Sequence, residues 1–456
     1  MKRILFVLWL SAICSNAIAS IFTAEDVNTL KEHFKANISA EGAIMASPSR
    51  SNPDYYFDWA RDSAISMNLI ASWYEQYRDQ DSKQKLFNYV SWVERLQHQQ
   101  DPLPGQDILG EPKFYMPDSP LASQPYTGPW GRPQNDGPAI RAITLMRFAN
   151  SLLADGESNY VREHLYFEGL NPDTMGAIKM DLEYTAHHWQ DKNFDLWEEV
   201  LGDHFFTAMV QRKALLEGSV FARQFNDRLA AQFYLQQARL IEKRLYKHID
   251  CKNNLIQATL PPHAGPQKTL ELDSAIILGV LLGNTHDGFF SADASYVKHT
   301  VDALKAEFKF LYPINEPYNN ALLFGRYPGD TYDGYRNDGK GNPWFILTAA
   351  AAEYYYTLAA NELKNTHHKS TVEQYIQLGD AYLRLIKDYA PDLLMSEQIN
   401  LETGVQQGAY SLTWSYVAVL RAIEASESVD RLLASTTHQV FNPGSVKRPI
   451  PENVLI

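Results

Sequence analysis

The 456-residue sequence predicts an all-α protein, an (α/α)6 barrel of six helical hairpins. Two observations support this fold class. Apolar residues recur with helical spacing along nearly the whole chain and leave almost no convincing strand. The connections between the predicted helices are alternately long and short, and helices that run up and down in turn place alternate connections at the same end. Six long loops therefore gather at one end of the barrel, where we expect a functional site.

Local signals mark the clearest helix starts, such as Thr23 before an acidic first turn and Asn342 before Pro343. Short connections are expected at 79–82, 218–220 and 363–369, and the connection 152–174 is long for its side. The predicted helices span 24–37, 60–78, 83–98, 137–151, 175–190, 204–217, 221–246, 273–283, 294–308, 343–362, 370–388, 411–425 and 427–434. The long connections fall at 38–59, 99–136, 191–203, 247–272, 309–342 and 389–410.

The first 19 residues have the features of a secretory signal peptide. A Lys-Arg pair precedes an apolar run from Ile4 to Cys14, and small residues lead to a cleavage site before Ser20. The run is too short to span a bilayer, and no other uncharged run approaches the ~20 residues of a membrane helix. We therefore expect an exported protein, periplasmic or extracellular. Residues 20–456 read as a single domain that ends in a surface strap at about 435–456.

Charge and cysteine content exclude several classes of partner. A net charge of −13 disfavours nucleic acid and anionic membranes, which need clustered Lys and Arg, and is compatible with a neutral ligand.

Cys14 leaves with the signal peptide, so Cys251 has no intrachain partner. A disulfide-free exported chain favours a bacterial source. No Cys/His cluster has zinc spacing and no acidic loop has calcium spacing, so we expect no metal and no cofactor. We also expect a monomer.

The loop that contains Glu198 and Glu199 is the most unusual of the long connections. Adjacent glutamates usually belong to a solvated helix face. Here Leu196, Trp197 and Val200 flank the pair, which favours carboxylates held against aromatic surface. Burial of this kind raises carboxylate pKa values and suits a general acid.

Other long loops combine aromatic residues with isolated charges. Arg61 and Asp62 follow the aromatic run Tyr55 to Trp59, and a cation and an anion beside aromatic rings suit sugar hydroxyls and sugar faces. Each feature also has an ordinary reading: Asp62 favours a helix start, Arg326 pairs with Asp330, Trp130 packs in the core, and Glu397 is a surface glutamate. Trp414 is the remaining candidate, and Gly110-Glu111-Pro112-Lys113-Phe114 is a further unusual stretch of the second long loop.

Together these segments resemble the glucoamylase family, glycoside hydrolase family fifteen, over roughly residues 40–430. The resemblance implies a secreted exo-acting enzyme that removes glucose from the non-reducing ends of starch-like α-1,4-glucans. It implies that Glu198 is the general acid, that Glu397 is the general base, and that Glu199 binds sugar. Cleavage with inversion requires a base about 6.5–9.5 Å from the acid, and two carboxylates on separate loops of one barrel end can meet that spacing. The other implied sugar contacts and pocket-floor residues are Tyr55, Trp59, Arg61, Asp62, Trp130, Leu196, Trp197, Arg326 and Trp414.

Two positions depart from the fungal pattern of this family. Phe57 stands where a Tyr is frequent, and Gly408 stands where a Ser often assists the base. We expect no starch-binding domain, so dissolved starch, glycogen and maltodextrins are the expected substrates. Two alternatives remain: a related exo-α-glucosidase that prefers isomaltose, dextran or trehalose, and a non-catalytic glycan-binding relative. Retention of both Glu198 and Glu397 argues against the second.

Overall fold

The computed structural model describes residues 21–441, except 168, 170, 172–174, 267, 269, 270 and 367, and for 436–441 it describes the backbone alone. The predicted signal peptide therefore lies outside the described residues, as do 442–456 of the predicted strap.

The described helices form two concentric rings. The inner ring closes on itself, because α2 packs on α4, α4 on α7, α7 on α9, α9 on α11, α11 on α13 and α13 on α2. The chain enters each inner helix from an outer one, so outer and inner helices alternate along the sequence. The inner helices are α2 (Ala60–Tyr77), α4 (Asp136–Ala154), α7 (Phe205–Gln224), α9 (Ala275–Leu282), α11 (Phe345–Asn365) and α13 (Thr413–Phe441). The outer helices are α1 (Ala24–Lys35), α3 (Gln80–Gln97), α6 (Ala177–His188), α8 (Arg228–Leu245), α10 (Ser295–Leu311) and α12 (Lys369–Tyr389).

Side-chain pattern separates the two rings. Inner helices are buried nearly all round, and α11 buries four consecutive alanines, 349–352, which let neighbouring backbones approach closely. Outer helices bury a single stripe, as in α8, where every buried residue falls on one face. Some outer helices also have strong start signals: the Thr23 side chain accepts from the Asp26 backbone, and Asp26 reciprocates. This division confirms the predicted (α/α)6 barrel of six helical hairpins.

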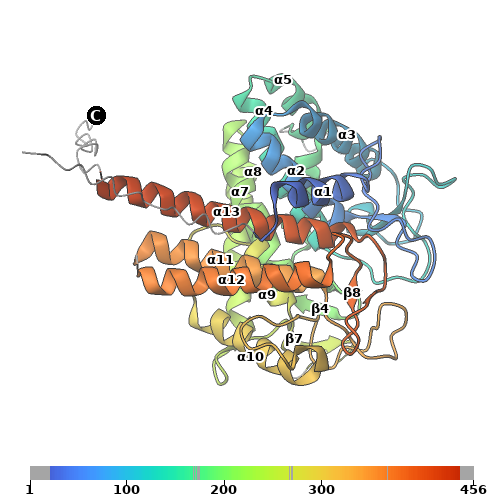
Figure 1. Cartoon of the computed structure of the whole chain (residues 1–456). Helices are drawn as coiled ribbons and strands as arrows, with labels where there is room; N and C mark the ends of the chain where they lie inside the picture. The colour runs from blue at the N-terminus through green and yellow to red at the C-terminus, as the bar shows by residue number, and fades with distance from the viewer. Residues whose placement is uncertain are drawn as a thin grey trace, which may run out of the picture.

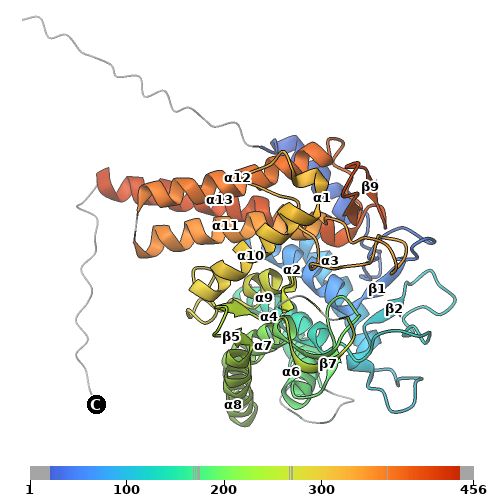
Figure 2. The same ribbon diagram turned by 90° about the horizontal axis from the view of Figure 1, so that it is seen from below.

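Short strands and turns shape the long loops. Antiparallel pairs join β1 (Phe57–Trp59) to β2 (Lys113–Tyr115), β5 (Ile249–Asp250) to β6 (Leu255–Ile256), and β8 (Gln398–Ile399) to β9 (Gln406–Gln407). A three-stranded sheet has the order β3 (Asn193–Phe194), β4 (Leu201–His204), β7 (Thr259–Ala264). Figure 1 shows β8, and Figure 2 shows β1, β2 and β9, at the end opposite the C-terminal end of α13. Single turns are η1 (Ile108–Gly110), α5 (Ser158–Tyr160), η2 (Val161–Leu165), η3 (Tyr246–His248) and η5 (Pro313–Asn315).

Two local predictions were wrong. The predicted connection 218–220 lies inside α7, because Gly218 is a packing position and a Cβ there would stand 2.6 Å from Leu182. The actual turn follows α7, where Asn226 has φ +62° and the Asp227 side chain caps α8. The two predicted helices after residue 411 are one helix, α13, which continues to Phe441 and includes the first part of the predicted strap. The connection 152–174 contains α5 and η2.

Candidate functional site

A cavity of about 580 Å³ lies where the long loops enter the inner helices. Its lining comes from the loops that precede α2, α4, α7, α11 and α13, and from the first residues of α2, α11 and α13, so segments far apart in the sequence share one wall. All twelve residues singled out from the sequence line this cavity: Tyr55, Trp59, Arg61, Asp62, Trp130, Leu196, Trp197, Glu198, Glu199, Arg326, Glu397 and Trp414. Their individual roles stay predictions.

Glu198 lies in a tight turn between β3 and β4. Its φ of +67° is in the left-handed region, which is uncommon for a residue with a side chain. Asp195 holds this turn, because its Oδ1 accepts the backbone N–H groups of Glu199 at 2.8 Å and Val200 at 2.9 Å. A strained backbone held by surrounding bonds is typical of a functional turn.

The Glu198 carboxylate has two N–H donors on the same oxygen. Its Oε1 accepts from the Trp59 indole at 2.8 Å and from the Gln134 amide at 2.9 Å. The Arg61 guanidinium lies 3.8 Å from this oxygen. Both described hydrogen bonds to this carboxylate therefore fall on Oε1.

Glu397 is fully buried, with an exposed fraction of 0%, whereas the Glu198 side chain is 18% exposed. The Tyr55 hydroxyl donates to its Oε1 at 2.8 Å, and the Tyr332 hydroxyl donates to its Oε2 at 3.2 Å. Burial raises the pKa of Glu397 to about 7, against the opposing effect of the two hydroxyl donors and Arg326. Gly408 packs directly on this carboxylate.

Arg61 and Asp62 lie in the first turn of α2 beside the cavity, where Arg61 is buried and Asp62 is half-buried. Arg61 donates from one amino group to Gln134 at 2.8 Å and to Asp136 at 2.9 Å, and its Nε lies 3.5 Å from Asp62. Burial raises the pKa of Asp62 to about 7, and Arg61 opposes this shift. The pair is therefore a structural ion pair that also presents polar atoms to the cavity.

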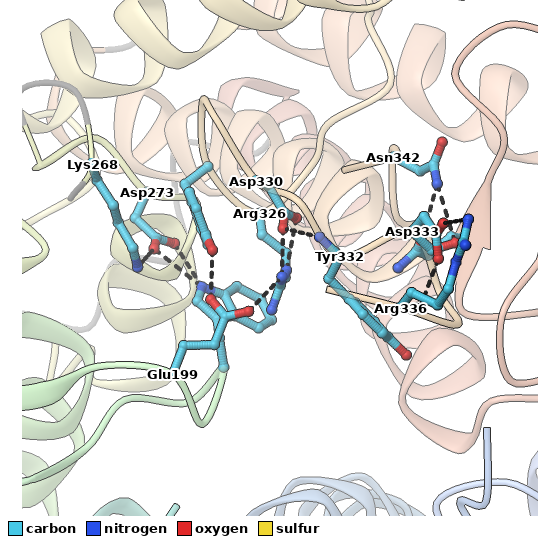
Figure 3. Close-up of polar contacts among 12 residues, drawn as sticks. Glu199, Lys268, Asp273, Arg326, Asp330, Tyr332, Asp333, Arg336 and Asn342 are labelled. Atoms are coloured by element: carbon cyan, nitrogen blue, oxygen red, sulfur yellow. Dashed lines mark hydrogen bonds and ion pairs between the residues drawn. The ribbon is translucent and has the colours of Figure 1, made fainter. Parts of the chain in front are cut away.

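Arg326 links Glu199 to Asp330 (Figure 3). It donates through Nε to Asp330 at 2.8 Å and through one amino group to Glu199 at 2.8 Å. The Tyr327 hydroxyl donates to the second Glu199 oxygen at 2.5 Å. Burial raises the pKa of Glu199, and Arg326 opposes this shift. Arg326 thus makes the ordinary pairing with Asp330 and also holds a cavity carboxylate.

Sequence reasoning missed Lys113 as a cavity residue. Its ammonium lies within 3.9–4.6 Å of the ring centroids of Phe57, Trp59, Tyr126 and Trp130. Burial lowers its pKa to about 8. A lysine in a predicted polar loop looks solvated, and its four rings come from two separate loops. The quoted segment around Lys113 was the available signal. Other lining residues without a predicted contact include Asp54, Phe57, Tyr126, Tyr332, Tyr335 and Trp344.

The two candidate catalytic carboxylates are held by neighbouring rings. Trp59 donates to Glu198, Tyr55 donates to Glu397, and the Trp59 and Tyr55 ring centroids are 5.5 Å apart. This places a partly exposed carboxyl, Glu198, and a buried carboxyl, Glu397, on one aromatic floor. Such a floor with carboxylates and guanidinium groups around it suits a sugar, which has apolar faces and hydroxyl edges.

Neither a metal cluster nor a membrane helix occurs in the described part of the chain. No group of three or more His, Cys, Asp or Glu residues there is placed to hold a metal ion. None of the described helices is both long and apolar enough to cross a bilayer.

Comparison with known proteins gives a consistent result. The sequence model of glycosyl hydrolases family 15 matches residues 22–424. The chain is 33% identical to a glucoamylase of Saccharomycopsis fibuligera over 456 residues. This match covers 87% of this chain and 86% of the relative. It is 33% identical to a glucoamylase of Blastobotrys adeninivorans over 86% of this chain and 68% of the relative. The solved structure of a Saccharomycopsis fibuligera glucoamylase superposes with a TM-score of 0.78 at 30% identity, covering 92% of this chain and 98% of that one.

Proposed function

Because the chain belongs to glycosyl hydrolase family 15, we propose that it is an inverting exo-hydrolase that removes terminal α-1,4-linked glucose from non-reducing ends of starch, glycogen and maltodextrins. The observation that carries this proposal is the pair of carboxyl groups on one aromatic floor: Glu198, partly exposed, and Glu397, buried. An acid and a base in unlike environments are what glycosidic cleavage requires.

Glu198 acts as the general acid. The Trp59 and Gln134 donors occupy its Oε1, so the proton lies on Oε2 and passes to the glycosidic oxygen as the bond to the anomeric carbon breaks. The nearby Arg61 and the two N–H donors then stabilise the carboxylate that remains.

Glu397 acts as the general base. It takes a proton from a water molecule that attacks the anomeric carbon on the face opposite the leaving group. Tyr55 and Tyr332 orient its two oxygens, and burial raises its pKa to about 7, which strengthens it as a proton acceptor. Both proton transfers balance: one proton leaves Glu198, and one arrives on Glu397.

The size and polarity of the cavity support action at a chain end. A volume of about 580 Å³ walled by several loops suits the last few sugars of a chain. Arg61, Asp62, Glu199 and Arg326 present hydroxyl-binding atoms, and Trp130 offers a ring face. The predicted substrates are therefore neutral glucans with an accessible non-reducing end.

Glucose release tests this proposal directly. Soluble starch, maltotriose, isomaltose and trehalose are incubated with the parent, with Glu198→Gln and with Glu397→Gln. We expect glucose from starch and maltotriose in preference to the other two sugars, and almost none from either variant. Preference for isomaltose or trehalose would favour the related α-glucosidase, and sugar binding without glucose release by the parent would favour a non-catalytic relative.

We also propose that the protein is exported and that it acts as a monomer. The features of residues 1–19 support export. Amino-terminal sequencing of the protein recovered outside the cytoplasm should begin at Ser20, and a mature protein that retains Met1 would contradict the proposal. Light scattering of the purified protein should give the mass of one chain.

A further inference from the structure

A buried lysine lies behind the turn that carries Glu198 and Glu199. Lys268 contacts Asp273 at 2.6 Å and Asp195 at 3.4 Å, and its side chain is 1% exposed. Figure 3 shows Lys268 directed at Asp273, on the side of Glu199 away from Asp330. The ammonium also lies 4.2 Å from the centroid of the Tyr327 ring.

Each partner of Lys268 fixes a different part of this turn. Asp195 accepts the backbone N–H groups that follow Glu198. Asp273 accepts the indole N–H of Trp197 at 2.9 and 3.1 Å. Tyr327 donates its hydroxyl to Glu199. The Lys268 ammonium therefore contacts all three groups. The first holds the backbone of the turn, the second holds Trp197, and the third holds Glu199.

The segment before Lys268 packs along the same turn. Ala264, the last residue of β7, pairs with Leu201 of β4. A Cβ on Gly265, which has φ +129°, would stand 2.7 Å from the Glu199 carbonyl oxygen. This close approach requires glycine, three residues before Lys268.

Lys268 does not reach the substrate cavity. It is absent from the residues that line the large cavity, and the small cavity beside it has a volume of about 10 Å³, space for about one water molecule. The buried charges depend on one another. Burial raises the pKa of Asp195, but Lys268, His204 and the backbone donors outweigh this effect and hold that pKa below its usual range.

We propose that Lys268 is a positioning residue for the hydrolytic reaction: by pairing with Asp195 and Asp273 together, it keeps the Trp197-Glu198-Glu199 turn in its reactive geometry. The inference rests on the proposed function of Glu198. Since the acid must reach one glycosidic oxygen, a displacement of the turn by about 1 Å costs on the order of 100-fold in rate.

Lys268→Met is compared with Lys179→Met, a matched control outside the cavity. Lys179 is also 1% exposed, pairs with Asp227 at 2.7 Å and Glu183 at 3.1 Å, and lies 5.6 Å from each of two tyrosine rings. Both variants should lose thermal stability. Well below both melting temperatures, Lys268→Met should lose 10- to 100-fold in kcat per folded molecule and raise KM, while Lys179→Met stays within threefold in both. Lys268→Arg, which keeps the charge, should recover part of the loss.

A double variant tests the proposal if Lys268→Met does not fold. Lys268→Met combined with Asp273→Asn removes one buried charge of each sign and keeps an acceptor for the Trp197 indole. Its kcat should remain at least tenfold below the parent. Folded Lys268 variants with kcat and KM within threefold of the parent overturn the proposal.

The indole N–H resonance of Trp197, assigned with Trp197→Phe, gives a readout that does not depend on activity. It should move in Lys268→Met and stay in place in Lys179→Met, and an unmoved signal in Lys268→Met overturns the proposal. Absence of glucose release by the parent would refute the proposed function and leave this structural test in force.

Discussion

Gly408→Ala gives a direct test of the contact between the chain and the candidate base. A Cβ at this position would stand 2.4 Å from Oε2 of Glu397, and 3.2 Å from its Cβ. An ordinary contact begins near 3.4 Å, so the carboxylate must retreat by about 1 Å. Misplacement of this size costs on the order of 100-fold in rate. We therefore expect kcat on soluble starch to fall about 100-fold.

The backbone of Gly408 adds a separate effect on stability. Its φ of +76° lies in the left-handed region, and alanine there costs about 1 kcal/mol of unfolding free energy. Gly105 has the same φ of +76°, and a Cβ there meets nothing within 4 Å. Gly105→Ala is therefore a control with equal backbone strain and no collision.

The assay combines urea unfolding with initial rates of glucose release. Gly408→Ala should lose at least as much free energy of unfolding as Gly105→Ala, because the collision with Glu397 adds to the shared backbone strain. Gly105→Ala should keep the parent kcat. If folded Gly408→Ala keeps kcat within threefold of the parent, the reasoning that a displaced Glu397 carboxylate slows the reaction is wrong.

Three further predictions concern the acid, the hydroxyl donors and a buried histidine. Glu198→Gln should abolish nearly all activity and leave sugar binding intact, because an amide cannot donate the proton; a loss below tenfold would exclude Glu198 as the acid. Tyr55→Phe removes a hydrogen bond to the Glu397 carboxylate, so it should raise the pKa of this base and move the acidic limb of the kcat/KM profile upward by about 1–2 pH units. Tyr332→Phe should move this limb by less, and the alkaline limb should stay fixed in both variants. An unmoved acidic limb would contradict the role of Glu397. Burial lowers the pKa of His248 from 6.5 to about 4, so between these pH values the unfolded chain binds a proton that the folded chain does not. About 3 kcal/mol of unfolding free energy should therefore be lost as pH falls from 6.5 to 4. In urea unfolding, His248→Gln should lack this dependence of unfolding free energy on pH, and an unchanged dependence would refute the role given to His248.

The barrel was predictable because its signal is repeated along the chain. Helical spacing and the alternation of long and short connections both report the same up-and-down path, and an error at one turn does not change the ring. The error at Gly218 shows the limit of local rules. Glycine ends helices in general, but here it lets α7 approach Leu182 of α6, and only the packed structure shows that contact.

The site residues were accessible to sequence reasoning where a loop contained an unusual local pattern. Glu198 was conspicuous beside Trp197, whereas Lys113 was not, because its cage is formed by rings from two loops that meet through the pairing of β1 with β2. Lys268 was invisible for the same reason. Its partners, Asp195, Asp273 and Tyr327, lie 73, 5 and 59 residues away and converge only in the fold.

The central claim, that Glu198 and Glu397 act as the acid and base of an inverting hydrolase, is tested most directly by the anomer of the first product. Water attacks from the face opposite the leaving group, so an α-linked chain end should release β-glucose. Proton NMR of the anomeric signals in the first minutes of maltotriose digestion, before mutarotation, reports the product. We predict that β-glucose appears first and that Glu397→Gln, still folded, releases almost none; initial appearance of α-glucose would contradict the mechanism and the role of Glu397 as base.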